Sequence, residues 1–460
     1  MKQIQITTKT RLVILLLLAT IIVPQWSFSQ TIINKDPRIE TATQAITTES
    51  LQNTIESLVE FHTRHNLSTQ SSAEIGIGAA SNYIEERLNE LSVGKENFVS
   101  IERVRYKVGG SGTRLEREVW LPNIIATIKG SNADDDRVIV MLAHYDSRTE
   151  NNNDSTSFAP GANDNGSGVA ALMETATILV QNRLPITVKI MFLSGEEHGL
   201  LGAAHMADVA RKENWNVIAV INNDMISNSQ SSDTDIRNNT KLRVFSENIP
   251  FVETEQQAKE RDYNSSQNDS PSRQLARYIK EIGERYTPNL EIKLIYRIDR
   301  FGRGGDHTPF CKQGFTAVRV CEYYENYDRT HAITQTIDGR EFGDVIKGVD
   351  FEYLRKNTVD NLATVMNMAF APAAPQNVFT DASDLSNYSK ISWQAPAIGV
   401  KPAGYYLLIR ETDKSQWEKK IFVEGESVVV PYSKDNYFFA VQSVSEAGNE
   451  SVAVFSRGKR

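Results

Sequence analysis

The 460-residue chain contains only two cysteines, Cys311 and Cys321. So few thiols exclude a disulfide framework, a four-cysteine zinc site and most iron–sulfur clusters. The spacing of ten residues does not fix the distance between the two Cα atoms, so the thiols are either paired or free. A metal in this protein would therefore be held mainly by carboxylates and imidazoles.

Clusters of basic residues are also missing, and the formal net charge is −8. This balance argues against a nucleic-acid partner bound through its phosphates. The apolar run over residues 12–23 would extend roughly 18 Å as a helix, which is short of the roughly 30 Å hydrocarbon core of a bilayer. A permanent membrane anchor is therefore the weaker interpretation.

The first 29 residues have the order of a cleavable signal peptide. Lys2, Lys9 and Arg11 precede the apolar run, and the small-residue pattern Ser27-Phe28-Ser29 follows it. Cleavage would remove three positive charges and leave a formal net charge of −11. We therefore expect a secreted or periplasmic protein with no stable membrane insertion after cleavage.

The remaining chain divides at a linker rich in alanine and proline, residues 371–375. A content of 40% hydrophobic and 23% charged residues is ordinary for globular protein. We expect one domain over residues 30–372 and a second over residues 373–460.

In the first domain, predicted helices alternate with short apolar strands, which indicates a largely parallel sheet covered on both faces. The fold class predicted is a three-layer α/β/α domain. Residues 227–273 are rich in Ser, Asn, Asp and Gln with little periodicity, so we expect a surface insertion there. The predicted strands are 124–128, 138–143, 188–193, 217–221 and 317–320, and the predicted helices lie within 42–91, 166–180 and 272–285.

The second domain changes to short strands separated by turn residues, which predicts a small all-β sandwich. Trp393, the pair Tyr405-Tyr406 and the loop over residues 445–451 resemble a fibronectin type III module. Its expected role is that of a spacer or an adhesive arm that could contact a surface or polymer. The strands are predicted at 391–393, 405–409, 418–423 and 437–444.

Acidic and histidine side chains follow the predicted strands of the first domain. His144 and Asp146 would lie on one side of their strand, so Asp146 could orient the imidazole for a metal, or the two could form a structural pair. Asp164 stands in a glycine-rich loop that opens a helix, where it could cap the helix or bridge two cations. This loop lacks the lysine of a phosphate loop and the G-x-S-x-G pattern of a serine nucleophile.

Glu196 and Glu197 follow a third strand, and Asp224 follows a fourth. Adjacent acids at a strand-to-helix corner point in different directions, so one could bind a metal while the other acts as general base. A solvated acidic turn is the alternative. Ligands bind outside the carboxyl ends of strands in α/β sheets, and four such ends in succession argue for one hydrolytic site. Histidine with Asp and Glu ligands favours zinc.

These segments resemble the zinc-dependent aminopeptidase family, which includes bacterial leucyl aminopeptidases, glutamate carboxypeptidases and the related glutaminyl cyclases. The resemblance implies two zinc ions per chain, with Glu196 as general base. It implies that His144 and Asp224 hold one zinc, that Glu197 and a late histidine hold the other, and that Asp164 bridges them. The matching stretches are HYDS, GANDNGSG, FLSGEEHGLLG, NNDMI and GGDHTPF.

The late histidine is assigned to His331, because it follows the strand at 317–320, whereas His307 stands beside Asp306 in a glycine-rich loop. Many members of the family have a tyrosine immediately before this histidine, where this chain has Thr330. An oxyanion-stabilising tyrosine would then have to come from elsewhere, and the candidates are Tyr323, Tyr324 and Tyr327. Structural roles are expected for His62, His65, His198 and His205.

The expected function is that of an exported di-zinc metallopeptidase, specifically an aminopeptidase that releases N-terminal residues from peptides. Two cations would lower the pKa of a shared water toward about 7, and Glu196 would take its proton. A glutaminyl cyclase or a carboxypeptidase on the same fold is the alternative within the family. A noncatalytic binding or adhesion protein is the alternative of another class.

Overall fold

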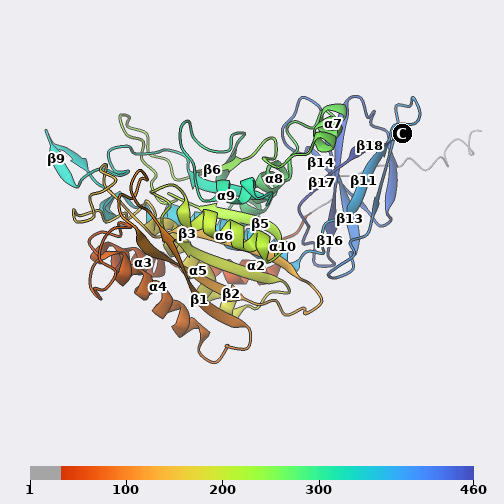
Figure 1. Ribbon diagram of the computed structural model, residues 1–460. Coiled ribbons are helices and arrows are strands. Elements are labelled where there is room, and N and C mark those ends of the chain that lie inside the picture. Colours follow the sequence, from red (N-terminus) through yellow and green to blue (C-terminus); the bar gives the residue numbers. More distant parts are fainter. Residues whose placement is uncertain (1–32, 460) are drawn as a thin grey trace, which may run out of the picture.

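The computed structural model describes residues 33–459, so the predicted signal peptide lies outside the described residues (Figure 1). A mixed sheet of eight strands forms the centre of the first part, in the order β1-β2-β4-β3-β5-β8-β6-β7. Its strands are β1 (Val99–Val108), β2 (Val119–Ile128), β3 (Arg137–His144), β4 (Thr187–Leu193), β5 (Asn216–Asn223), β6 (Lys241–Ser246), β7 (Glu291–Ile295) and β8 (Ala317–Glu322).

The four central strands, β4, β3, β5 and β8, run parallel to one another. Antiparallel pairs join β1 to β2, β2 to β4 and β6 to β8. The predicted α/β fold is thus confirmed, with a sheet that is parallel at its centre and mixed toward its edges. The carboxyl ends of the four central strands meet at one edge, which brings the residues after them together.

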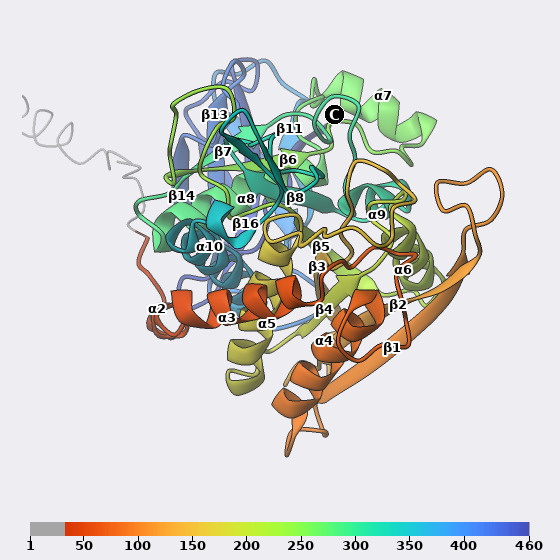
Figure 2. The same ribbon diagram turned by 90° about the vertical axis from the view of Figure 1, so that its left-hand side faces the viewer.

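Both faces of the sheet are covered, as the apolar strands predict. Along β3, Ile139 and Met141 belong to one buried cluster, and Val140 and Leu142 to another on the opposite face. This alternation explains why the strand is apolar at almost every position. The second cluster contains residues of α6 (Leu201–Lys212) and α9 (His307–Lys312), which lie together in Figure 2. The first contains residues of α2 (Pro37–Gln44), α3 (Thr48–Glu60), α4 (Gly76–Ser92), α5 (Gly166–Gln181), α8 (Pro271–Tyr286) and α10 (Phe351–Phe370).

The prediction of a surface insertion over residues 227–273 is wrong in part, because this segment contains β6, an internal strand of the sheet. Leu242 and Val244 are fully buried there, and β6 pairs with both β7 and β8. The alternation in this short strand is flanked by polar segments, so its identity depends on distant partners. Helix α7 (Glu255–Tyr263), by contrast, has no buried residue and lies beside the sandwich in Figure 1.

Two four-stranded sheets form the C-terminal sandwich, in the orders β15-β12-β11-β18 and β14-β13-β16-β17. Trp393 packs edge-on against Tyr405 in its core, with ring centroids 5.3 Å apart. The strands are β11 (Gln376–Asp381), β12 (Ser389–Gln394), β13 (Gly404–Glu411), β14 (Lys419–Val423), β15 (Ser427–Val430), β16 (Tyr437–Val444), β17 (Val454–Phe455) and β18 (Arg457–Lys459).

Buried ion pairs attach the sandwich to α8 and to the segment before it. The fully buried Glu450 pairs with Arg285 of α8 and, at 3.2 Å, with Lys420 of the sandwich. Arg410 of the sandwich pairs with Asp269 at 2.6 Å, and both side chains are almost wholly buried. The expected spacer or adhesive arm is therefore held against the α/β part by charges that are shielded from water.

Both cysteines are buried and unpaired, which settles the alternative that the sequence left open. Within residues 33–459, none of the helices combines the length and the apolar composition needed to cross a membrane.

Candidate metal centre

Six side chains from five segments meet at the carboxyl edge of the central strands. They line one cavity of about 420 Å³, apart from the buried His144 beside it. β3 supplies His144, the loop before α5 supplies Asp164, and β4 leads to Glu196 and Glu197; β5 leads to Asp224, and the loop after β8 supplies His331.

His144 is the centre of the first group of donors. Its Nε2 atom lies 3.3 Å from a carboxylate oxygen of Asp164 and 3.8 Å from one of Asp224. Its Nδ1 atom lies 3.1 Å from the backbone carbonyl of Asp146, whose carboxylate is at 3.5 Å. A proton on Nδ1 would satisfy that carbonyl and leave the Nε2 lone pair facing the two acids, as metal binding requires.

His331 is the centre of a second group that shares Asp164 with the first. Its Nε2 atom lies 3.0 Å from Asp164 and 2.9 Å from Glu197. Burial lowers the pKa of His331, but the attraction of Glu197 and Asp164 outweighs it and raises this pKa to about 10. The acids thus favour positive charge at this point, which a divalent cation would supply.

The donor atoms fit zinc by their chemistry and their spacing. His144, Asp164 and Asp224 form one group whose donor atoms all lie within 4.8 Å of one another, and Asp164, Glu197 and His331 form another. Each group combines imidazole with carboxylate, which is a donor set typical of hydrolytic zinc sites. Asp164 offers one carboxylate oxygen to each histidine, so two cations could share it.

Glu196 lies in the same cavity and belongs to a third group of neighbouring donors, with His144 and Glu197. Burial raises the pKa of Glu196 well above its usual value, although attraction to His144 opposes the shift, and the carboxylates of Asp224 and Glu197 raise it further. A carboxylate whose pKa is raised above its ordinary value is a stronger base, which suits it to accept a proton and return it.

The turn that carries the acid pair depends on Gly195, whose φ is +79°. A Cβ atom at this position would lie 3.0 Å from the Cβ atom of Leu201 and 3.2 Å from the hydroxyl of Tyr106. The carboxylate of Asp146 accepts from the backbone N–H groups of Glu196 and Glu197, at 3.3 and 3.2 Å. Asp146 therefore holds the turn in place in addition to facing His144.

Three buried partners of the site were not predicted from the sequence. Asp344 accepts from the N–H groups of Asn163 and Asp164, at 2.9 and 2.7 Å. Asn66 donates to Asp146 at 2.6 Å, and Arg319 lies 3.0 Å from Asp224. Each is far from its partner along the chain, so no local pattern identifies it.

Arg148 was also missed, although it directly follows the HYDS segment. Its Nε atom donates to Glu197 at 2.9 Å, and its Nη2 atom lies 2.8 Å from Nδ1 of His331. Its position directly after that segment could have identified Arg148 as a neighbour of the site from the sequence alone.

The other histidines belong to none of the groups of metal donors found in the described residues. His307 bonds through Nε2 to the carbonyl of Ile298, at 2.7 Å, and belongs to neither group of metal donors. His65 and His198 each lie 2.8 Å from the carbonyl of Asn152, in agreement with structural roles. Of the two candidates for the last ligand, the structure thus brings His331 to the acids.

None of the proposed substitute tyrosines reaches the site. Tyr323 and Tyr324 pack edge-on against each other with ring centroids 4.8 Å apart, and the side chain of Tyr327 is 63% exposed. Within residues 33–459, no tyrosine lines the cavity that holds the acids. In this structure, therefore, none of these three takes the place of the missing tyrosine beside the acids.

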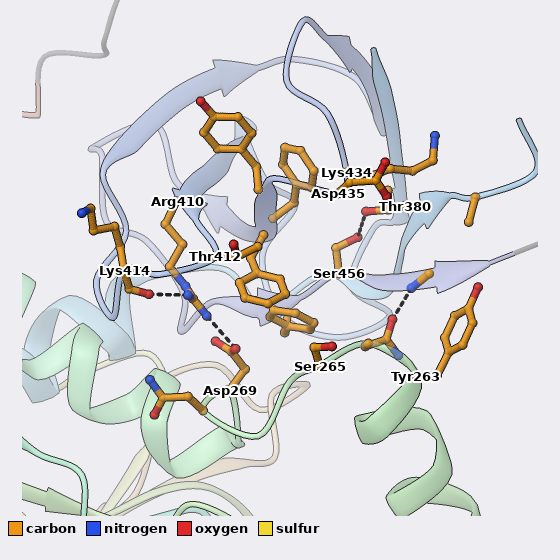
Figure 3. A pocket seen from close by; sticks show the side chains of 18 of the residues that line it. Tyr263, Ser265, Asp269, Thr380, Arg410, Thr412, Lys414, Lys434, Asp435 and Ser456 are labelled. Carbon is orange, nitrogen blue, oxygen red and sulfur yellow. Dashed lines mark hydrogen bonds and ion pairs between the residues drawn. The ribbon is translucent and has the colours of Figure 1, made fainter. Parts of the chain in front are cut away.

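A larger cavity, of about 1160 Å³, lies between the sandwich and the segment before α8 (Figure 3). Its walls include the ion pair of Arg410 with Asp269 and the hydrogen bond of Thr380 with Ser456. None of the groups of metal donors found in the described residues lies there. The groups of metal donors found in the described residues thus lie at the smaller cavity.

Residues 123–349 match peptidase family M28. The chain is 37% identical over 422 residues to a probable zinc metalloprotease of Leptosphaeria maculans, covering 91% of this chain and 97% of the relative. It is 38% identical over 405 residues to a probable zinc metalloprotease of Pyricularia oryzae, covering 87% and 80% of the two chains. The matched region contains every side chain of the two groups of donors.

Two solved structures from Legionella pneumophila share the fold. LapB superposes with a TM-score of 0.52 at 14% identity, covering 75% of this chain and 79% of LapB. The LapA aminopeptidase gives a TM-score of 0.52 at 16% identity, covering 75% and 78% of the two chains. At this identity the likeness concerns the fold alone.

Proposed function

Because the chain belongs to peptidase family M28 and is a zinc metallopeptidase by family, we propose that it is a di-zinc aminopeptidase that releases N-terminal residues from peptides. The observation that carries this proposal is the position of Asp164, one carboxylate oxygen of which faces His144 while the other faces His331. A carboxylate shared in this way by two histidines is suited to bridge two metal ions. The N-terminal sequence supports export as part of the proposal.

In this proposal, His144 and Asp224 would hold one zinc and Glu197 and His331 the other, with Asp164 available to both. Zinc ions bound there would polarise the scissile carbonyl and lower the pKa of a water molecule.

Glu196 is the proposed general base, since it lies beside the donors without belonging to either of the two groups that share Asp164. It takes a proton from the attacking water and returns it to the departing amine. Asp146 assists by fixing the backbone N–H groups of the turn that carries Glu196.

The test combines metal content with hydrolysis of a panel of aminoacyl anilides by the wild type and by Glu196→Gln. We expect about two zinc ions per chain in both proteins, and a loss of about 10²–10⁴-fold in turnover in Glu196→Gln. Glu86→Gln, on the exposed surface of α4, is the matched control and should retain full activity. A zinc-free wild type that hydrolyses no peptide would overturn the proposal and favour a noncatalytic binding protein.

The same experiment separates the related activities. A carboxypeptidase would leave the anilides intact and shorten peptides from the C-terminus. A glutaminyl cyclase would convert N-terminal glutamine without cleaving a peptide bond. Either result would retain the zinc site and reject the aminopeptidase.

A further inference from the structure

Four arginines line the cavity that holds the acids: Arg114, Arg148, Arg300 and Arg303. Its acidic lining, within residues 33–459, consists of Asp164, Glu196, Glu197 and Asp224, which are the proposed ligands and the proposed base. The cavity thus has a positive wall, in which Arg148 contacts two of the proposed ligands and the other three arginines contact none of them.

The four guanidinium groups differ in how far the protein already neutralises them. Arg300 is neutralised, because it lies 2.6 Å from Glu325 and 3.4 Å from Asp299. Arg114 is exposed, and within residues 33–459 its guanidinium donates only to the amide oxygen of Asn152, at 3.3 Å. Arg303 is exposed, and its guanidinium makes no hydrogen bond or ion pair within the described part of the chain.

Arg148 contacts Glu197 and His331, two of the proposed zinc ligands. Its Nη2 atom lies 2.8 Å from Nδ1 of His331, while Nε2 of His331 faces the acids. A neutral imidazole that binds a metal through Nε2 carries its proton on Nδ1, and this N–H cannot accept from a guanidinium. With zinc in place, the outer nitrogen of Arg148 would therefore be available to another acceptor.

The balance of charge then favours an anion at the mouth of the cavity. The four acids carry −4 when ionised, and two Zn²⁺ ions would supply +4, so these charges cancel. Arg114 and Arg303 then remain without an acidic partner among the described residues, while Arg148 would share Glu197 with the metal and present its outer nitrogen to the cavity. The planar donor fork of arginine matches a carboxylate, which it can bind through two parallel hydrogen bonds.

We propose that these three arginines select substrates that place a carboxylate beside the scissile peptide bond. The inference rests on the proposed peptidase function and specifies its substrate class. The carboxylate belongs either to an acidic side chain of the peptide or to the C-terminus of a very short peptide. Both sources offer the same group to the arginines, and the experiment separates them.

The test measures kcat/KM of the zinc-loaded wild type on matched peptides. Glu-Leu-Phe-amide against Gln-Leu-Phe-amide tests an acidic side chain, and Ala-Leu against Ala-Leu-amide tests a free C-terminus. A charge-assisted hydrogen bond predicts that at least one carboxylate peptide is preferred by about tenfold or more. This preference should shrink at high salt, because exposed charges are screened.

The variant Arg114→Gln/Arg303→Gln should reduce the preference by about tenfold. Arg105→Gln, an exposed arginine of β1 outside the cavity, is the matched control and should keep the wild-type preference. Binding of the same peptides to zinc-loaded Glu196→Gln, measured by calorimetry, should show the same order of affinities without turnover.

The outcomes distinguish this inference from the proposed function. Cleavage of all four peptides without a preference for either carboxylate would overturn the inference and leave the peptidase intact. A preference that Arg114→Gln/Arg303→Gln retains in full would overturn the assignment to these arginines. Failure to cleave any peptide would overturn the proposed function, and the calorimetric comparison would then decide whether the arginines bind carboxylates.

Discussion

Asp164 belongs to both of the donor groups that contain a histidine paired with it, and is the proposed bridge between two zinc ions. It lies 3.3 Å from Nε2 of His144 through one oxygen and 3.0 Å from Nε2 of His331 through the other. Its backbone is held in turn by Asp344. If Asp164 bridges two zinc ions, as proposed, its loss should weaken binding at both positions together.

Asp164→Asn should therefore reduce zinc binding at both positions, since an amide offers one neutral oxygen in place of two charged ones. We expect fewer than two zinc ions per chain after dialysis and loss of the stabilisation that zinc gives against thermal unfolding. Asp208→Asn, on the surface of α6, is the control and should bind zinc as the wild type does. Two tightly held zinc ions in Asp164→Asn would contradict the bridging role.

At the scale of residues, the sequence predicts those site residues whose position follows from the strand next to them. His144, Glu196, Glu197 and Asp224 each stand at or just after the end of an apolar strand, so the pattern alone places them at one edge of a sheet. Other residues of the site, such as Asp344 beside Asp164 and Asn66 beside Asp146, are distant in the chain from their partners and were missed. Their contacts exist only after folding, so no spacing predicts them.

Among the elements, the turn between β4 and α6 determines where Glu196 and Glu197 point. Its backbone requires the positive φ of Gly195, where a side chain would crowd Leu201 and Tyr106. The chemistry of the acid pair thus depends on a residue that contributes no side chain.

Gly195→Ala should lower both stability and turnover, because it combines an unfavourable φ with a close contact. The φ alone costs about 1–2 kcal/mol for a residue with a side chain. Gly94→Ala is a matched control, since Gly94 has a φ of +74° and no atom within 4 Å of the point that a Cβ would occupy. Denaturant unfolding should show the larger loss for Gly195→Ala, and equal losses would contradict the role of crowding.

The elements themselves were largely predictable, because buried strands and amphipathic helices leave clear patterns. In the central sheet β1, β6 and β7 were not predicted, and β6 shows why. Its alternation covers only residues 241–246 within a long polar stretch, and its place between β8 and β7 comes from pairing with strands that follow much later. A short strand flanked by polar segments is specified by its partners more than by its own sequence.

On the scale of the whole molecule, the sandwich and the α/β part are joined by buried charge. Glu450 is fully buried and faces Arg285 and Lys420. Burial tends to raise the pKa of Glu450, but the attraction of Lys420 and Arg285 prevails and lowers it to about 2. The ionised form is therefore the one that stabilises the interface.

Glu450→Gln should destabilise the junction by about 1–3 kcal/mol, because Arg285 and Lys420 lose the buried carboxylate that they share and keep only Glu281 as a partner. Calorimetry should show the two parts unfolding at separate temperatures in this variant and together in the wild type. Glu260→Gln breaks only the partly exposed pair with Arg457 and should change little. An unchanged single transition in Glu450→Gln would contradict the account.

The lowered pKa of Glu450 also predicts how the stability of the protein changes at acid pH. A carboxyl group whose pKa is lower in the folded than in the unfolded protein stabilises the fold above its unfolded pKa, and this contribution is lost as the pH falls. For Glu450 the loss should occur between about pH 4.5 and pH 2. Unfolding at stepwise lower pH should show it in the wild type, and Glu450→Gln should lack this component.

The sequence predicted two folded units and the linker between them, since composition and periodicity change abruptly at residues 371–375. It did not predict that they are docked. Docking depends on single charged residues, such as Asp269 and Arg410, that look like ordinary surface positions in the sequence.

The most direct test of the central claim is a crystal structure of the zinc-loaded protein with anomalous scattering measured at the zinc edge. Our account predicts two anomalous peaks about 3.5–4 Å apart, with Asp164 bound to both. One peak should contact His144 and Asp224, and the other Glu197 and His331. A single peak, or a zinc bound by His307 in place of His331, would contradict it.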